Sequence, residues 1–194
     1  MQPEHKETID RHQGLGQINI RKRQAPVRKD YESDPKRAWI IDSARTSSDQ
    51  IDANHPIHGH VVFGTGIPAS QAVSVHKAVG GESDFPCPGE ILAAAIASCL
   101  DTSTRMIANL LGINLKYLAV KVDLGVDIRG TLMMEKSVPV GFQRVNISYD
   151  LKTSDDVKDG QLETLMKAAE RSCVILETLR NPPNINLVRN SQIE

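Results

Sequence analysis

The chain has 194 residues, which suffice for one sizeable core but not for two ordinary domains. Apolar residues make up 40% of it and charged residues 24%, a globular composition. The formal net charge of -1 excludes a global field that would recruit nucleic acid or a membrane. No apolar leader opens the chain, and its longest nearly continuous apolar run, 91–100, is too short to span a bilayer. We therefore expect a cytoplasmic protein with reduced thiols and without nucleic-acid or membrane partners.

Residues 1–37 are polar, lack a sustained hydrophobic period and carry a basic excess between Arg21 and Arg37. No nucleic-acid-binding motif surrounds these charges, so we interpret them as a solvated arm. The sequence thus predicts a partly disordered N-terminal extension over 1–37 and a single domain over 38–194.

The sequence of the first half of that domain predicts short strands followed by a long helix. Strands are expected at 38–44, 59–64 and 72–79, before Gly80 and Gly81 break the pattern. Pro88 suits the first turn of a helix, and Gly112 is a natural C-terminal stop. Apolar residues occur almost all round the first half of this helix, which predicts that it is central and buried.

The second half predicts two strands and an amphipathic helix. Residues 120–128 and 145–151 alternate apolar and polar side chains, as in an antiparallel sheet covered on one face, with a turn near Pro139. A helical stripe starts near Asp159 and ends before Asn181, and 185–188 could add an edge strand. The predicted class is α+β, with a mostly antiparallel sheet packed on two main helices.

Cys99 and Cys173 each lie on the apolar stripe of a different predicted helix. If those stripes face one another, the two sulfurs meet. Two interpretations stay open: small buried hydrophobes, or a reactive thiol whose sulfenic acid condenses with a partner thiol.

The residues around both cysteines resemble those of the OsmC/Ohr family. The first segment is Gly80-Gly81 followed by Pro86-Cys87-Pro88-Gly89-Glu90-Ile91-Leu92-Ala93-Ala94-Ala95-Ile96-Ala97-Ser98-Cys99-Leu100. The second is Ala168-Ala169-Glu170-Arg171-Ser172-Cys173 with Thr178-Leu179, and it looks like the family's second-cysteine helix. The resemblance spans about residues 57 to 189.

This resemblance implies an intertwined homodimer with central cysteine helices and thiol-dependent reduction of organic hydroperoxides. Cys99 would become the sulfenic acid, and Cys173 would resolve it as a Cys99–Cys173 disulfide. No metal or other cofactor is implied, and a dithiol or lipoylated protein would supply the electrons. The alternative is an OsmC-like homodimer that binds a hydrophobic small molecule without peroxidase activity. Another thiol enzyme or redox sensor on the same scaffold is a third hypothesis.

Family peroxidases usually place a glutamate ten residues before the first cysteine and use an arginine from an early strand. Here Gly89 holds the glutamate position, and Glu90 follows it. Glu90, Arg45 and Arg105 are the further candidates for catalytic residues, and His76 is another possible cation. Each has an ordinary alternative: a favourable charge on the first helical turn for Glu90, and a surface charge or ion pair for the others.

Cys87 lies between two prolines and is either an oxidisable exposed thiol or a small loop residue. His55, His58 and His60 cluster before a strand, and His58 and His60 would share a face. No zinc-binding motif accompanies them, so we interpret them as ordinary strand or loop histidines.

Overall fold

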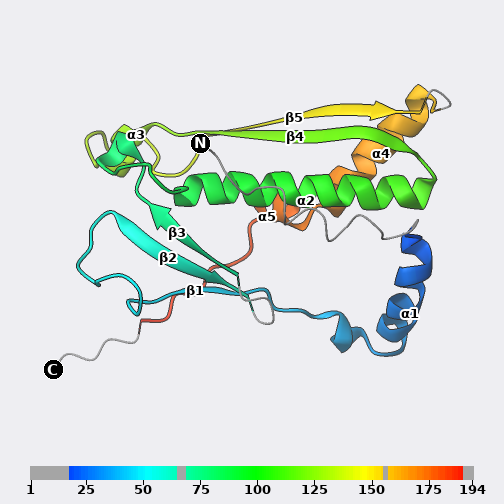
Figure 1. Cartoon of the computed structure of the whole chain (residues 1–194), viewed down its shortest axis with the longest axis horizontal. Coiled ribbons are helices and arrows are strands. Elements are labelled where there is room, and N and C mark those ends of the chain that lie inside the picture. Colours follow the sequence, from blue (N-terminus) through cyan, green and yellow to red (C-terminus); the bar gives the residue numbers. More distant parts are fainter. Residues whose placement is uncertain (1–17, 65–68, 155–156, 190–194) are drawn as a thin grey trace, which may run out of the picture.

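The structure, a computed structural model, describes residues 18–64, 69–154 and 157–189. These residues form helices, two short 3₁₀ segments and two antiparallel sheets (Figure 1). In chain order the elements are α1 (Ile20–Ser33), η2 (Pro35–Ala38), β1 (Ala44–Thr46), β2 (His58–Phe63), β3 (Ala69–Ser74), η3 (Lys77–Val79), α2 (Pro88–Leu111), β4 (Leu115–Gly125), α3 (Ile128–Thr131), β5 (Arg144–Thr153), α4 (Asp159–Ser172) and α5 (Val174–Arg180).

Strands β4 and β5 form a long two-stranded sheet that covers α2. They pair antiparallel from Leu115 opposite Thr153 to Gly125 opposite Arg144. The alternation predicted from the sequence is confirmed, because apolar side chains from both strands pack on the buried core. These side chains are Val120, Val122, Leu124, Ile147 and Tyr149.

Helix α2 is the central element, as the sequence predicted. It packs against β4, α4 and α5, and Ile96 and Leu100 are fully buried. Gly112 ends it in the left-handed conformation, with a φ of 73° that suits glycine. By length and composition α2 could cross a membrane. Its packing among a sheet and two helices is that of a core helix.

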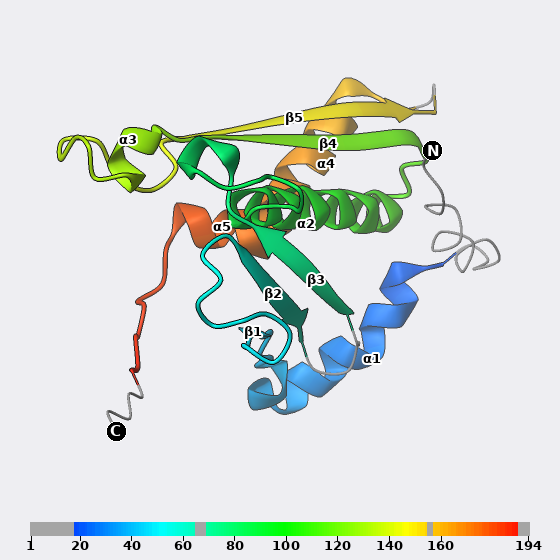
Figure 2. The same cartoon turned by 60° about the vertical axis from the view of Figure 1, so that its left-hand side comes forward.

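The three-stranded sheet β1–β2–β3 projects from this body (Figures 1 and 2). Among the described residues, Ser74 is the one buried residue of these strands. The strands pack mainly on one another.

Part of the N-terminal extension is helical, which the sequence did not predict. Asn19 caps α1 by accepting a hydrogen bond from the Lys22 amide. The Asn109 side chain on α2 accepts from the Ile20 amide at 2.9 Å and donates to the Ile18 carbonyl at 2.8 Å. These bonds attach α1 to the C-terminal end of α2. The rest of the predicted extension, residues 1–17, lies outside the described residues.

Several details of the strand and turn predictions are wrong. The strand expected over 38–44 begins only at Ala44, and Trp39, Ile40 and Ile41 are exposed instead of lying in a sheet. The strand expected over 72–79 ends at Ser74, because His76 caps a 3₁₀ turn by accepting from the Ala78 amide. Residues 185–188 form no strand. The turn expected near Pro139 belongs to a longer connection that contains α3, and the strand expected over 120–128 ends at Gly125.

The second predicted helix is broken in two at Cys173. Cys173 is extended, with φ −78° and ψ 102°, and it lies between α4 and α5. Its sulfur accepts a hydrogen bond from the Leu176 amide at 3.4 Å and so caps α5. The apolar period runs through the break, so periodicity alone could not reveal it.

Replacing Asn109 by alanine is expected to loosen α1, because it removes two hydrogen bonds to that segment. Backbone amides over 18–33 should exchange roughly 10-fold faster, the effect of losing about 1–2 kcal/mol of local stability. Hydrogen exchange read by mass spectrometry measures this, with the exposed Asn114→Ala as the matched control. Equal exchange in the two variants would contradict the docking of α1.

Candidate functional site

Two free thiols meet in the core. Cys99 lies on α2 and packs against the cluster of Ile96, Leu100, Cys173 and Leu176. Cys173 is fully buried, and the Cys99 side chain packs against the apolar cluster that contains it, close enough to affect the pKa of its thiol. The sequence predicted that these cysteines could meet, and the folding of α4 and α5 onto α2 brings them together.

The two thiols differ in their surroundings. Burial, together with the contact to Cys99, raises the pKa of the Cys173 thiol to about 11. The amides of Leu176 and Ile175 partly oppose that increase. Cys99 is only partly buried. Cys173 is therefore protonated at neutral pH, and Cys99 is the more accessible of the pair.

Tyr149 of β5 adds a polar group beside this pair, which the sequence analysis counted only as an inward-facing position. Its hydroxyl is buried and has no hydrogen-bond partner among the described residues. Burial raises the pKa of Tyr149 to about 12, and the charges of Glu170 and Cys173 contribute to this increase. A neutral phenol that can donate a hydrogen bond thus lies in the electrostatic range of Cys173.

Arg180 is the cation whose charge reaches this region, and the sequence analysis did not consider it. It pairs with Glu177 at 2.9 Å and with Glu170 at 3.3 Å. Its charge lowers the pKa of Tyr149. Arg180 follows Cys173 by about two helical turns, so it lies on the same side of the chain, and that spacing could have identified it.

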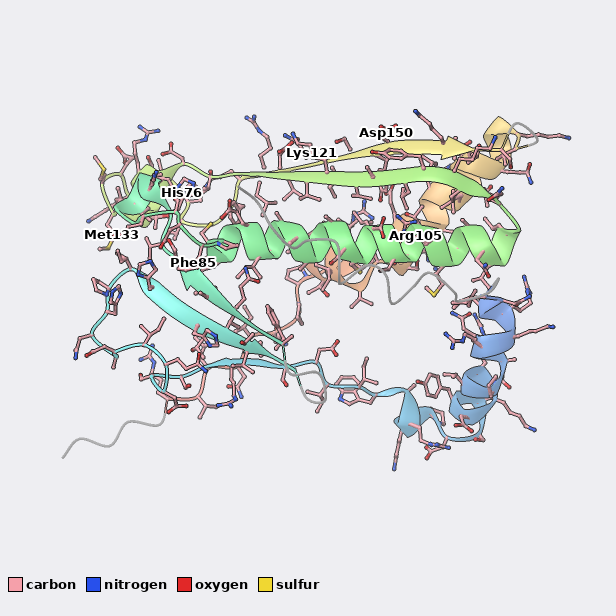
Figure 3. All side chains as sticks on the ribbon, viewed as in Figure 1. His76, Phe85, Arg105, Lys121, Met133 and Asp150 are labelled. Carbon is pink, nitrogen blue, oxygen red and sulfur yellow. The ribbon has the colours of Figure 1, made fainter. Side chains whose placement is uncertain are left out.

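The other predicted site residues lie elsewhere. Glu90 accepts a hydrogen bond from the Cys87 amide at 2.8 Å in the first turn of α2, and this bond lowers the Glu90 pKa. Arg45 is exposed on β1. Arg105, which is labelled in Figure 3, pairs with Asp101 one turn earlier on α2 at 2.8 Å. Within one chain none of the three is found beside the cysteine pair.

A largely apolar cavity of about 720 Å³ lies at the N-terminal end of α2. Its walls come from this end of α2, from the end of β4 and from the connection before β5. His76, Cys87 and Glu90 supply polar groups, and Val122 and Phe142 are among the apolar ones. Cys99 and Cys173 are not among its lining residues. Cys87 is partly exposed and is one of the residues that line this cavity.

The geometry thus defines an α+β protein with two thiols in contact between a central helix and a broken second helix. A protein-family model described as OsmC-like protein matches residues 80–188, more than half of the chain. The chain therefore belongs to the OsmC/Ohr family, as its cysteine segments indicated.

Solved structures with this fold include three bacterial proteins of low sequence identity. A protein from Legionella pneumophila described as organic hydroperoxide resistance protein OsmC is 18% identical, with TM-score 0.52, and the match covers 73% of this chain and 90% of that one. An OsmC-like protein of Mycoplasma pneumoniae is 10% identical, with TM-score 0.57, and the match covers 74% of this chain and 89% of that one. An OsmC-like protein of unknown function from Vibrio cholerae is 18% identical, with TM-score 0.56, and the match covers 72% of this chain and 94% of that one. At this identity the likeness shows the fold, and the α+β prediction is confirmed. A search of curated proteins gave no match.

Cys173 is expected to react with iodoacetamide much more slowly than Cys87 in the reduced native protein. With a thiol pKa of about 11, only about 0.1% of Cys173 is thiolate at pH 8. Its rate should rise as the pH approaches 11, because the thiolate is the nucleophile. Peptide mass spectrometry of timed samples measures each site, and protein unfolded in guanidinium gives the reference rates. Equal native rates at pH 8 would contradict the burial of Cys173.

Proposed function

We propose that the protein is a cytoplasmic thiol-dependent peroxidase that reduces organic hydroperoxides through Cys99 and Cys173. The observation that carries this proposal is the contact of two free thiols from separate elements within one apolar cluster. Two apolar side chains would pack in this core equally well, but only two thiols can give up a pair of electrons to a peroxide and form a disulfide. Membership of the OsmC/Ohr family supports the same assignment.

In the proposed reaction the Cys99 thiolate attacks the terminal peroxide oxygen. The O–O bond breaks, Cys99 becomes a sulfenic acid, and the alcohol leaves with a proton. The Cys173 thiol then displaces water from the sulfenic acid and forms the Cys99–Cys173 disulfide. A dithiol or a lipoylated protein returns both thiols to the reduced state by exchange.

The surroundings of the pair suit these two roles. Because burial keeps Cys173 protonated, Cys173 does not compete with Cys99 for the peroxide. The Leu176 amide already donates to the Cys173 sulfur and can stabilise negative charge that develops there during resolution. The apolar cluster around the pair favours hydroperoxides that carry an organic group.

Glu90, Arg45 and Arg105 remain candidates for peroxide binding through a second chain. Arg45 lies on the projecting sheet, and Glu90 lies at the far end of α2 from the docked α1. In an intertwined dimer Arg45 or Glu90 could approach the thiol pair of the second chain.

One equivalent of an organic hydroperoxide should convert reduced protein into the Cys99–Cys173 disulfide within seconds to minutes. Non-reducing peptide mass spectrometry measures this, with loss of two thiols per chain. Cys99→Ser should abolish the reaction, while Cys173→Ser should consume peroxide and stop at the sulfenic acid. Cys87→Ser is the matched control and should behave as the parent chain. Thiols that stay free through prolonged exposure would refute the peroxidase proposal.

The second candidate function is binding of a hydrophobic small molecule without peroxide reduction. The cavity at the N-terminal end of α2 favours it, since its volume and mostly apolar walls are typical of ligand sites. Unreactive thiols in the peroxide experiment, together with a ligand that binds equally to Cys99→Ser, would favour this function.

We also propose that the working form is a homodimer. Three large apolar side chains stay exposed before β1: Trp39 at 82%, Ile40 at 70% and Ile41 at 79%. The exposed side of α2 carries the small residues Ala94, Ser98 and Thr102 one turn apart, which would let a second helix approach closely. Patches of this kind normally mark an interface.

Light scattering coupled to size exclusion should give twice the chain mass of 21.3 kDa. Ser98→Trp should shift the protein toward the monomer, because the indole prevents close approach of two α2 helices. Ser148→Trp, on an exposed position of β5, is the matched control and should remain dimeric. A parent chain that elutes as a monomer at micromolar concentration would rule out this assembly.

A further inference from the structure

A second cluster of chemically active side chains lies outside the cysteine pair, where β2 begins. His58 is the first residue of β2, and Glu82 and Asp84 belong to the loop before α2. The His58 Nε2 atom lies 3.0 Å from each carboxylate oxygen of Asp84 and 4.0 Å from Glu82 Oε2. One ligand atom from each of the three residues can be chosen so that all lie within 4.8 Å of one another.

The imidazole of this cluster is held in place by its neighbours. The side chain of His58 is only 19% exposed. The Phe85 ring meets it edge-on with centroids 5.9 Å apart, and the His55 ring lies 4.9 Å away. The His55 Nδ1 atom also accepts a hydrogen bond from the His58 amide. Nε2 is thereby directed toward the two carboxylates.

The loop that carries the carboxylates is fixed by separate bonds. The Ser83 amide donates to the Val75 carbonyl at 3.3 Å, and the Ser83 hydroxyl accepts from the Lys77 amide at 2.8 Å. Gly81 lies so close to Val75 that an added Cβ would be 1.9 Å from the Val75 carbonyl oxygen. Glu82 and Asp84 thus lie on either side of Ser83, which these hydrogen bonds hold in place. Both carboxylate side chains remain accessible to solvent, at 62% and 40% exposure.

We propose that His58, Glu82 and Asp84 bind a divalent transition-metal cation of the zinc type. Zinc takes imidazole nitrogen and carboxylate oxygen at about 2.0–2.2 Å, so neighbouring ligand atoms in a tetrahedral site lie about 3.3 Å apart. The separations of 3.0 and 4.0 Å bracket that value, and small side-chain rotations would close the site. The two carboxylates provide the negative charge, and the imidazole provides a nitrogen ligand that disfavours Mg²⁺ and Ca²⁺.

Water would complete the coordination shell around these three ligands. No other described residues of the cluster types His, Cys, Asp and Glu gather in such a group. The site involves neither Cys99 nor Cys173, so metal binding there is independent of peroxide reduction at the cysteine pair.

The test is calorimetric titration of the full-length, chelator-treated protein with zinc chloride, under reducing conditions with a non-thiol reductant. One ion per chain is expected. His58→Ala and Asp84→Ala should each weaken binding about 10-fold or more, since each removes a ligand. His60→Ala is the matched control on the same strand and should bind like the parent chain.

Cobalt as a second probe distinguishes the ligands, because thiolate ligation adds an intense near-ultraviolet band that His and carboxylate ligands do not. Circular dichroism checks that each variant is folded, and Asp84→Ala, at an exposed position, keeps the test valid if His58→Ala unfolds. No heat with zinc at millimolar concentration, unchanged affinity in Asp84→Ala, or a thiolate band with cobalt would each overturn the proposal.

Discussion

Burial of the apolar side of α2 is the constraint on which the other elements depend. An isolated helix of this length and composition would expose too much apolar surface, so a sheet and two further helices must cover it. The alternation of β4 and β5 supplies one cover, and the stripe on α4 and α5 supplies the other. The buried Thr104 hydroxyl in this core is satisfied locally, because it donates to the Leu100 carbonyl at 2.7 Å. The cysteine contact is a result of this packing, because each thiol lies on a face that must be buried.

The sequence predicted the elements whose signals are local. Pro88 and Gly112 bound α2 as expected, and the alternation over β4 and β5 gave their faces correctly. Helix α1 contains an internal Pro26 and a polar composition, and its docking depends on Asn109, far away along the chain. The break at Cys173 lies within a continuous apolar period. Both features are set by tertiary contacts, which a one-dimensional pattern does not encode.

The same distinction holds for the candidate site. Cys99 and Cys173 were predictable because residue type, apolar stripe and family resemblance agree. Tyr149 looked like any inward-facing aromatic residue, and only the structure shows that its hydroxyl is buried near Cys173. The three histidines before β2 suggested a shared face for His58 and His60. The structure instead joins His58 to carboxylates from a loop that follows β3.

The position of Cys173 between α4 and α5 has a thermodynamic consequence when it forms the proposed disulfide with Cys99 of α2. A covalent bond between this junction and α2 would enclose β4, β5 and α4 within one loop of the chain. Loop closure of that size removes conformational entropy from the unfolded ensemble and is worth about 4 kcal/mol in the simplest polymer treatment. Oxidised and reduced forms would then differ in global stability as well as in chemistry. The lifetime of the protein in the cell would consequently report the balance between oxidant and reductant.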